Sequence, residues 1–289
     1  MTNRQLFTYC GAVFLAGWTC QVLTIVFTDD FDSLGAKSGL MATMVSPLLV
    51  TIGFMVFDRS LLQKIRCKPN KRFCCTALLA ILVPTFTAFA VLFIATGLHW
   101  GQSGWFGFSA NGVAVSGGPF LLGLGQQTWV WFAANVLVTA AAYSLLTGLV
   151  AVGEEVAWRG LLQGVLTERF GPLCGIVILG FLWAMWHLPI QLAGYNYPEN
   201  PVLGSLVISP LMLISVSLFY GWLTLKSNSF IPAAIAHGAY NTIEEGIISN
   251  IDLAVPLLYL ITIKLAVTAA TGLLFGCLIR QRLDSPTCC

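Results

Sequence analysis

Uncharged apolar stretches, each long enough to cross a lipid bilayer, recur along the whole chain. The first covers residues 6–27, and its 22 residues would extend about 33 Å as a helix, enough to cross the hydrocarbon core. We predict eight such spans, which lie at residues 6–27, 39–57, 74–98, 129–152, 172–193, 202–225, 230–248 and 255–279. The first is too long for the apolar part of a signal peptide, so we expect it to be retained. The pattern therefore predicts an all-α fold, a polytopic transmembrane helical bundle of about eight spans.

One apolar stretch continues into a predicted helix that is longer than the bilayer is thick. Between residues 129 and 170 there is no proline, and a single helix of that length would extend about 63 Å. We expect a break inside it, at Gly148 or Gly153, because glycine is the residue at which a helix bends most easily. A second turn is predicted at Gly171 and Pro172, since glycine commonly ends a helix and proline commonly begins one.

The composition agrees with a membrane protein and excludes other classes. Hydrophobic residues make up 57% of the chain and charged residues only 9%, whereas soluble domains have about 25% charged residues. Intrinsic disorder is excluded because it requires low hydrophobicity and high charge. The net charge of +2 gives no indication of a nucleic-acid partner. The partners that we expect are therefore the lipid bilayer and molecules held in or at it.

Basic residues in the short loops predict the orientation of the spans. Six of them follow the second span, namely Arg59, Lys64, Arg66, Lys68, Lys71 and Arg72. Because cytoplasmic loops carry the excess of Lys and Arg, this loop should be cytoplasmic, and eight alternating spans then put both termini on the same side. In a bacterium the membrane would be the inner one. Residues 99–128 contain no charged side chain and should form an outer loop, partly re-entrant.

A group of charged residues follows the fourth span, where charge is costly and points to function. Glu155 and Arg159 are four positions apart, with Glu first, which is the favourable order for an ion pair on a helix. Glu154 is five positions from Arg159 and turned away from it. We therefore expect Arg159 to hold Glu155 ionised, while Glu154 faces a cavity in which it could act as a general base. Alternatively, the three residues are a charge cluster at a helix end.

Two histidines lie within apolar stretches. His187 stands before the outer end of the fifth span, and a structural hydrogen bond to a neighbouring helix would also explain it. His237 and Asn241 are four positions apart, so both side chains share one helical face, and Gly238 lets another helix approach. Two carboxylates, Glu244 and Glu245, follow on the same face. They either orient His237 or mark the outer membrane boundary.

The residues with the clearest chemistry come from separate apolar segments. Glu154 and His187 lie almost symmetrically about the turn at Gly171, so antiparallel helices would place them at equal depth in the membrane. A carboxylate, two imidazoles and an amide in three apolar segments are difficult to explain by packing. We therefore favour a functional site over coincidence.

The order of these residues resembles the CPBP intramembrane protease family, which includes the type II CAAX prenyl endopeptidases and the Abi proteins. The family motifs are Glu-Glu-x-x-x-Arg, aromatic-x-x-x-His and His-x-x-x-Asn, and here they contain Glu154, Glu155, Arg159, His187, His237 and Asn241. The second motif usually begins with Phe, and this chain has Trp183. The resemblance divides the chain into residues 1–125, with three spans and the uncharged outer loop, and residues 126–289, with the catalytic core and a short cytoplasmic tail.

The resemblance implies an endopeptidase that cuts a membrane-associated peptide or protein, prenylated or not. It implies that Glu154 and His187 activate the attacking water, and that His237 and Asn241 stabilise the oxyanion. It also suggests a metalloprotease with a divalent metal cofactor, zinc first, which His187, His237 and Glu154 would bind.

Two other classes of function stay open. One is a proton-coupled transporter, because buried acids and proline-interrupted spans fit proton transport. The other is a non-catalytic scaffold or immunity protein that keeps the polar residues for helix association. Gly160 and Gly164 have the spacing of a close-packing motif that would serve such a scaffold.

Overall fold

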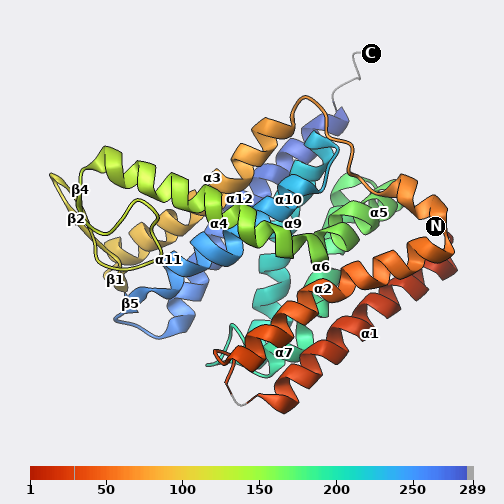
Figure 1. Ribbon diagram of the computed structural model, residues 1–289, viewed down its shortest axis with the longest axis horizontal. Coiled ribbons are helices and arrows are strands. Elements are labelled where there is room, and N and C mark those ends of the chain that lie inside the picture. Colours follow the sequence, from red (N-terminus) through yellow and green to blue (C-terminus); the bar gives the residue numbers. More distant parts are fainter. Residues whose placement is uncertain (29, 285–289) are drawn as a thin grey trace. The chain divides into compact units, whose positions relative to one another are not determined.

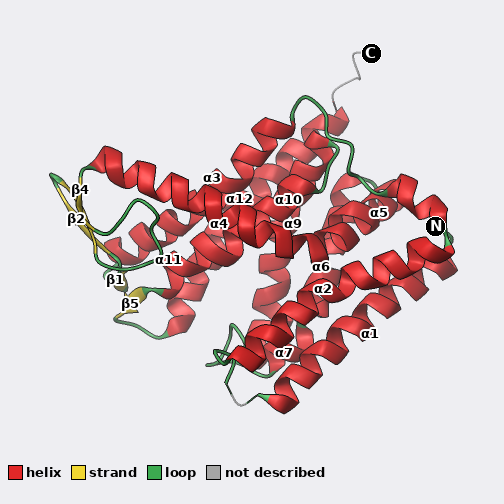
Figure 2. Cartoon of the chain, viewed as in Figure 1, coloured by secondary structure: helices red, strands yellow, loops and turns green. Residues whose placement is uncertain are grey.

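The computed structural model describes residues 1–28 and 30–284, and it is 76% helical (Figure 2). Among the described residues, six helical runs are long and apolar enough to cross a membrane. These are Asn3–Phe27, Leu34–Phe57, Phe73–Gly97, Trp129–Phe170, Pro201–Ser227 and Leu257–Gln281. The prediction of an all-α, polytopic helical bundle is confirmed, and the chain is an integral membrane protein.

The chain divides into two compact units. The first contains Met1–Phe73, Val150–Ala233 and the chain from Thr268, and the second contains Cys74–Leu149 and Ala234–Val267. Four helices begin in one unit and end in the other, namely α3 (Phe73–Gly97), of which only Phe73 belongs to the first unit, α4 (Trp129–Glu155), α10 (Ile231–Ala239) and α12 (Leu257–Asp284). The division at residue 126 that the family resemblance suggests stays a prediction.

The first unit begins with a helical hairpin, in which α1 (Asn3–Phe27) lies along α2 (Leu34–Phe57) (Figure 1). Thr2 caps α1 through a hydrogen bond from the backbone of Gln5, and Ser33 caps α2, as the first exposed N–H groups of a helix require. After α2 come a 3-10 helix (Arg59–Lys64) and a segment, residues 65–72, without a helix or strand.

A second hairpin in this unit packs more tightly. Helix α5 (Gln163–Phe170) turns at Gly171, whose φ of +80° suits glycine, and α6 (Pro172–Trp186) begins with proline. The predicted turn at Gly171 and Pro172 is confirmed. Helix α6 packs on α5 at Gly175 and on α9 (Ser209–Ser227) at Gly180, where a Cβ would stand 2.7 Å from the backbone of the neighbouring helix.

Two predicted spans are interrupted in the structure. The span predicted at residues 172–193 ends as α6 at Trp186 and restarts as α7 (Leu188–Leu192), because Pro189 cannot donate a backbone hydrogen bond to the preceding turn. The span predicted at residues 230–248 consists of α10, a π-helical segment (Tyr240–Glu244) and α11 (Glu245–Ser249). Neither is among the six long helical runs.

The expected break at Gly148 or Gly153 is wrong. Helix α4 runs through both glycines, and the irregular part follows as a π-helical segment, Val156–Leu162. Both glycines allow close packing, since a Cβ at Gly148 would lie 3.2 Å from the carbonyl oxygen of Ala234 and one at Gly153 would lie 2.5 Å from that of Met44. A third π-helical segment, Gly204–Ile208, joins α8 (Pro201–Leu203) to α9.

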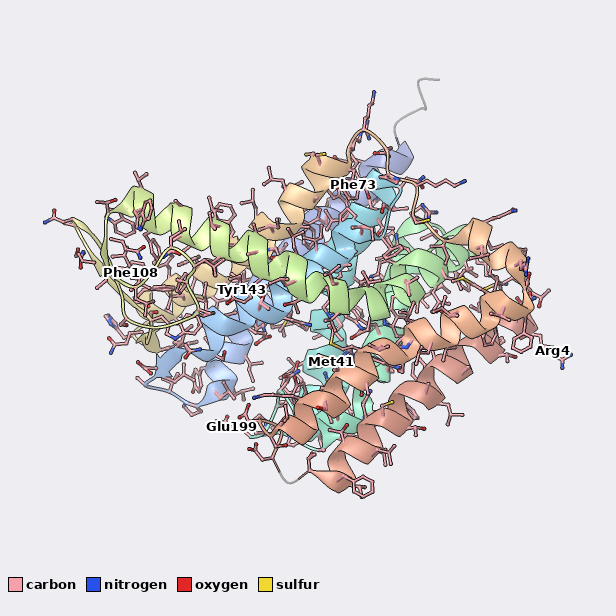
Figure 3. The ribbon with its side chains drawn as sticks, viewed as in Figure 1. Arg4, Met41, Phe73, Phe108, Tyr143 and Glu199 are labelled. Carbon is pink, nitrogen blue, oxygen red and sulfur yellow. The ribbon has the colours of Figure 1, made fainter. Side chains whose placement is uncertain are left out.

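The second unit contains α3 (Phe73–Gly97), which belongs to this unit from Cys74 onward. The segment that we expected to be an outer loop forms four short strands. Strands β2 (Phe106–Ser109), β3 (Gly112–Val115) and β4 (Gly125–Gln127) form an antiparallel sheet, and β1 (Gly101–Ser103) pairs with β5 (Ile251–Leu253). The registers pair Phe106 with Val115 and Val113 with Gln127. Phe108 lies among these strands (Figure 3), and buried Phe106, Val113 and Val115 anchor them in the core of the unit.

Candidate active site

Glu155 and Arg159 form the ion pair that their spacing predicts. The Glu155 Oε1 atom lies 2.9 Å from the Arg159 Nη1 atom, and both side chains are fully buried in the first unit. Arg159 also donates from Nη2 to the Ser217 hydroxyl of α9, at 2.8 Å. Its guanidinium lies 4.2 Å from the ring centre of Trp183 and 5.0 Å from that of Tyr220. The buried cation therefore has a carboxylate, a hydroxyl and two aromatic faces around it.

These contacts explain how a cation is tolerated in an apolar helix. Burying an isolated charge costs many kcal/mol, so a buried cation requires partners that replace water. Aromatic faces attract cations, by about 2 kcal/mol where water is excluded. Because its partners come from α6 and α9, Arg159 also connects the π-helical segment Val156–Leu162 to both helices.

Glu154 has a different partner, as its position on the helix suggested. The indole Nε1–H of Trp183 donates to Glu154 Oε2 at 2.8 Å, and Glu154 is only 1% exposed. The two adjacent carboxylates are therefore distinguished by their hydrogen bonds: Glu155 accepts from a cation, and Glu154 accepts from a neutral donor. A carboxylate that is not paired with a cation is the better candidate for accepting a proton.

His187 stands at the break between α6 and α7. Its Nδ1 atom lies 2.9 Å from the Trp183 carbonyl oxygen, one helical turn back. Since a carbonyl oxygen can only accept, Nδ1 carries the hydrogen in this bond, and the lone pair of the neutral ring is on Nε2. The ring also packs against the Trp186 ring in a T-shaped arrangement, with 4.8 Å between ring centres and an angle of 85° between the planes. Trp183 thus bonds both Glu154 and His187.

Helix α1 holds this break in place. The Trp186 carbonyl oxygen accepts from the Gln21 amide at 2.8 Å and from the Trp18 indole at 3.1 Å. The Gln21 side-chain oxygen accepts from the backbone N–H of Ile190 at 3.2 Å, on the other side of the break. Gln21 therefore satisfies one backbone group on each side of His187, which a break in a helix leaves without an intrahelical partner.

The third motif belongs to the second unit. His237 is 5% exposed and lies in α10, whereas Asn241 is exposed and lies in the π-helical segment Tyr240–Glu244. The predicted close approach at Gly238 is confirmed, because a Cβ there would lie 2.4 Å from the backbone of Ser144 and of Gly148.

The structure therefore places four of the six candidate residues in the same unit. Glu154, Glu155, Arg159 and His187 all lie in the first unit, and His237 and Asn241 lie in the second. The participation of the last two in one site with the first four stays a prediction. Two of the three motifs include part of a π-helical segment, a distortion that is common at functional sites.

The two carboxylates after Asn241 have different surroundings. Glu244 is 2% exposed, and its Oε2 accepts from the Thr87 hydroxyl of α3 at 2.9 Å. Glu245 has a side chain that is 43% exposed, and it pairs with Lys264. Glu245 is therefore partly exposed and ion-paired, whereas Glu244 is buried within the second unit.

The expected metal ligands do not form a complete set within either unit. Among the described residues, no three His, Cys, Asp or Glu side chains are grouped closely enough to bind a metal ion. The first unit offers Glu154 and His187, two donors, whereas catalytic zinc takes three protein ligands. We therefore derive no step of the reaction through a metal.

Sequence reasoning missed the residues that hold this site together. Ser217 and Tyr220 lie more than fifty positions from Arg159, and Gln21 lies in a span that carries no motif. Trp183 belongs to the second motif, where its aromatic bulk gives no indication of a hydrogen-bonding role. The one signal that could have revealed it is its indole N–H, a donor that needs an acceptor when it is buried.

Residues 127–243 match the model of the family described as type II CAAX prenyl endopeptidase Rce1-like. The family resemblance is confirmed. The matched segment contains all six candidate residues, from Glu154 to Asn241, and it leaves residues 1–126 and 244–289 outside. Over this segment the chain is similar to the CAAX-type membrane proteases. No curated protein matches the chain.

Proposed function

We propose that this chain is an intramembrane endopeptidase that hydrolyses a peptide bond in a membrane-associated peptide or protein. The observation that carries the proposal is that a buried carboxylate and an imidazole, Glu154 and His187, are both hydrogen-bonded to Trp183. The match to an Rce1-like family over the same residues supports it. Prenylated C-terminal peptides are therefore the first substrate class to test.

In the proposed reaction, Glu154 acts as the general base. It takes a proton from a water molecule, while the His187 Nε2 atom accepts a second hydrogen bond from the same water. The water oxygen bonds to the peptide carbonyl carbon, and the carbonyl electron pair moves to its oxygen. Hydrogen bonds from His237 and Asn241 would stabilise that oxyanion. When the carbon–nitrogen bond breaks, Glu154 returns the proton to the leaving amine, so that one carboxyl and one amine are released.

Glu155 and Arg159 have a supporting part in this proposal. Their ion pair fixes the π-helical segment that follows Glu154 against α6 and α9. Because Glu155 already accepts a hydrogen bond from the Arg159 guanidinium, we give it no part in proton transfer. In this proposal Glu154 is therefore the general base, and Glu155 has a structural role.

The cleavage experiment uses purified protein in proteoliposomes. The panel contains prenylated CAAX peptides and unmodified membrane-spanning peptides, each incubated with and without a chelator. We expect wild type to cut one class and Glu154→Gln to cut none while it stays folded. Glu168→Gln is the matched control, because Glu168 is exposed on α5 and should keep full activity. Loss of cleavage with chelator would support the divalent metal, zinc first, that the resemblance suggests.

The opposite result would favour the other classes of function. If folded wild type cuts nothing and Glu154→Gln still abolishes function in cells, the residue serves a binding or coupling centre. Loss of coupling in the Gln variant would favour a transporter, whereas a Gln variant that keeps its function would favour a scaffold.

We also propose that both termini and the loop after α2 face the cytoplasm, in the inner membrane if the chain is bacterial. The support is the excess of Lys and Arg in that loop. Cys67 is an exposed thiol within the loop and offers a direct test. A membrane-impermeant maleimide should modify Cys67 in inside-out vesicles and leave it unmodified in intact cells, with Cys67→Ser as the control. The reverse pattern would overturn the orientation.

A further inference from the structure

Trp183 contacts three residues of the candidate site through three different parts of its structure. Its indole N–H donates to Glu154 Oε2 at 2.8 Å. The face of its ring lies 4.2 Å from the Arg159 guanidinium carbon. Its backbone carbonyl accepts from the His187 ring at 2.9 Å. The residue is 3% exposed, so water does not compete strongly for these contacts.

The three contacts strengthen one another. A cation over the face of an indole draws electron density from the ring, which makes the N–H a better donor to a carboxylate. The carbonyl bond fixes which nitrogen of His187 carries the hydrogen and limits rotation of the ring. The ring and the carbonyl belong to one buried residue of α6. The positions of the Glu154 carboxylate and the His187 imidazole are therefore both fixed by Trp183.

We propose that Trp183 is a positioning residue that fixes Glu154 relative to His187, holding the carboxylate with its indole N–H and the imidazole with its carbonyl. This inference rests on the proposed function for its effect on turnover. Phe at this position would have no N–H to donate, so the hydrogen bond to Glu154 depends on the indole of Trp183.

The kinetic test is Trp183→Phe, which keeps an aromatic face and the backbone carbonyl and removes the N–H. Misplacing a reacting group by about 1 Å can cost on the order of 100-fold, so we expect kcat to fall by roughly 10- to 100-fold. KM should change by less than about twofold, because in this mechanism Trp183 does not touch the substrate. A residue that acts only through packing would leave kcat unchanged at equal folded protein, and that result would overturn the proposal.

Trp158→Phe is the matched control. Trp158 is as deeply buried as Trp183, and among the described residues its Nε1–H has no hydrogen-bond partner. The same substitution therefore removes an indole N–H that bonds nothing. Equal losses of kcat in the two variants would show that the change of ring size, not the hydrogen bond, causes the effect, and the proposal would fail.

A spectroscopic test separates this inference from the proposed function. In protein labelled with ¹⁵N at the indole nitrogen of tryptophan, the Trp183 resonance is the one lost in Trp183→Phe. Glu154→Gln should move this resonance and leave that of Trp158 in place. In Trp183→Phe, the His187 Nδ1 hydrogen bond should remain, because the substitution keeps the backbone carbonyl that accepts it. If wild type cuts no peptide, the proposed function fails, and these shifts alone decide the positioning. A Trp183 indole resonance that does not move in Glu154→Gln would overturn it. If Trp183→Phe does not fold, direct assignment of the Trp183 indole in wild type keeps this test decisive.

Discussion

Removing one member of the buried Glu155–Arg159 pair should cost more than removing both. Arg159→Met leaves the Glu155 carboxylate fully buried without its cation, and it also removes the bond to Ser217 and two aromatic contacts. Breaking a buried pair from one side typically costs about 3–5 kcal/mol, and this variant should lie near the upper end. Glu155→Met leaves Arg159 with Ser217 and the two rings, so we expect about 3 kcal/mol.

The double variant, Glu155→Met with Arg159→Met, should be less destabilised than either single variant. Methionine has a volume similar to those of the side chains that it replaces, and apolar replacement of a complete buried pair is often neutral. If the two single effects were independent, they would add to about 8 kcal/mol, so a small loss in the double variant means a coupling free energy of several kcal/mol. Most of that coupling is the cost of leaving one charge buried alone.

Unfolding in mixed micelles of a mild detergent and SDS measures these differences. The chain has nine tryptophans, which give a strong fluorescence signal of unfolding. Glu168→Met replaces an exposed carboxylate on α5 and should change stability by no more than about 0.5 kcal/mol. Additive single effects, with a double variant as unstable as their sum, would refute the reasoning, because they would mean that the two charges do not depend on one another.

Other predictions follow from individual contacts. Gly180→Ala should destabilise the first unit by about 1–3 kcal/mol, because the new Cβ would meet the backbone of α9, whereas Gly11→Ala meets nothing within 4 Å and should not destabilise. Thr87→Val should cost about 1–3 kcal/mol, since buried Glu244 loses its hydroxyl donor, and Thr87→Ser should restore most of this stability. Gln21→Leu should lower both stability and cleavage, because the Ile190 N–H loses its Gln21 acceptor and the Trp186 carbonyl oxygen loses one of its two side-chain donors. Unfolding and cleavage assays check all three, and variants that match wild type would contradict them.

Periodicity and local chemistry were sufficient for the parts of the fold that depend on neighbours in the sequence. The apolar stretches determined the class of protein, since only a run of that length and composition can cross a bilayer. The turn at Gly171 and Pro172 followed from what these two residues do at helix ends. The Glu155–Arg159 pair followed from helical geometry alone, because four positions correspond to about one turn.

The sequence was less informative where a backbone choice depends on packing. Gly148 and Gly153 were expected to break a helix, but neighbouring backbones approach them and α4 continues through both. The π-helical segments had no recognised signal, because an inserted residue is tolerated only where surrounding contacts compensate for it. The interruption at His187 was visible in Pro189 but was not predicted.

The sequence by itself determined that this is a membrane protein with a carboxylate and imidazole chemistry in its apolar segments. Only the tertiary structure decided which partner each group has. The Trp183–Glu154 bond joins residues 29 positions apart, and the Arg159–Ser217 bond joins residues 58 positions apart. Such contacts depend on how α6 packs against α9 and α5, which helical periodicity does not encode. The different surroundings of Glu154 and Glu155 follow from that packing, because a buried charge takes its properties from the groups that replace water around it.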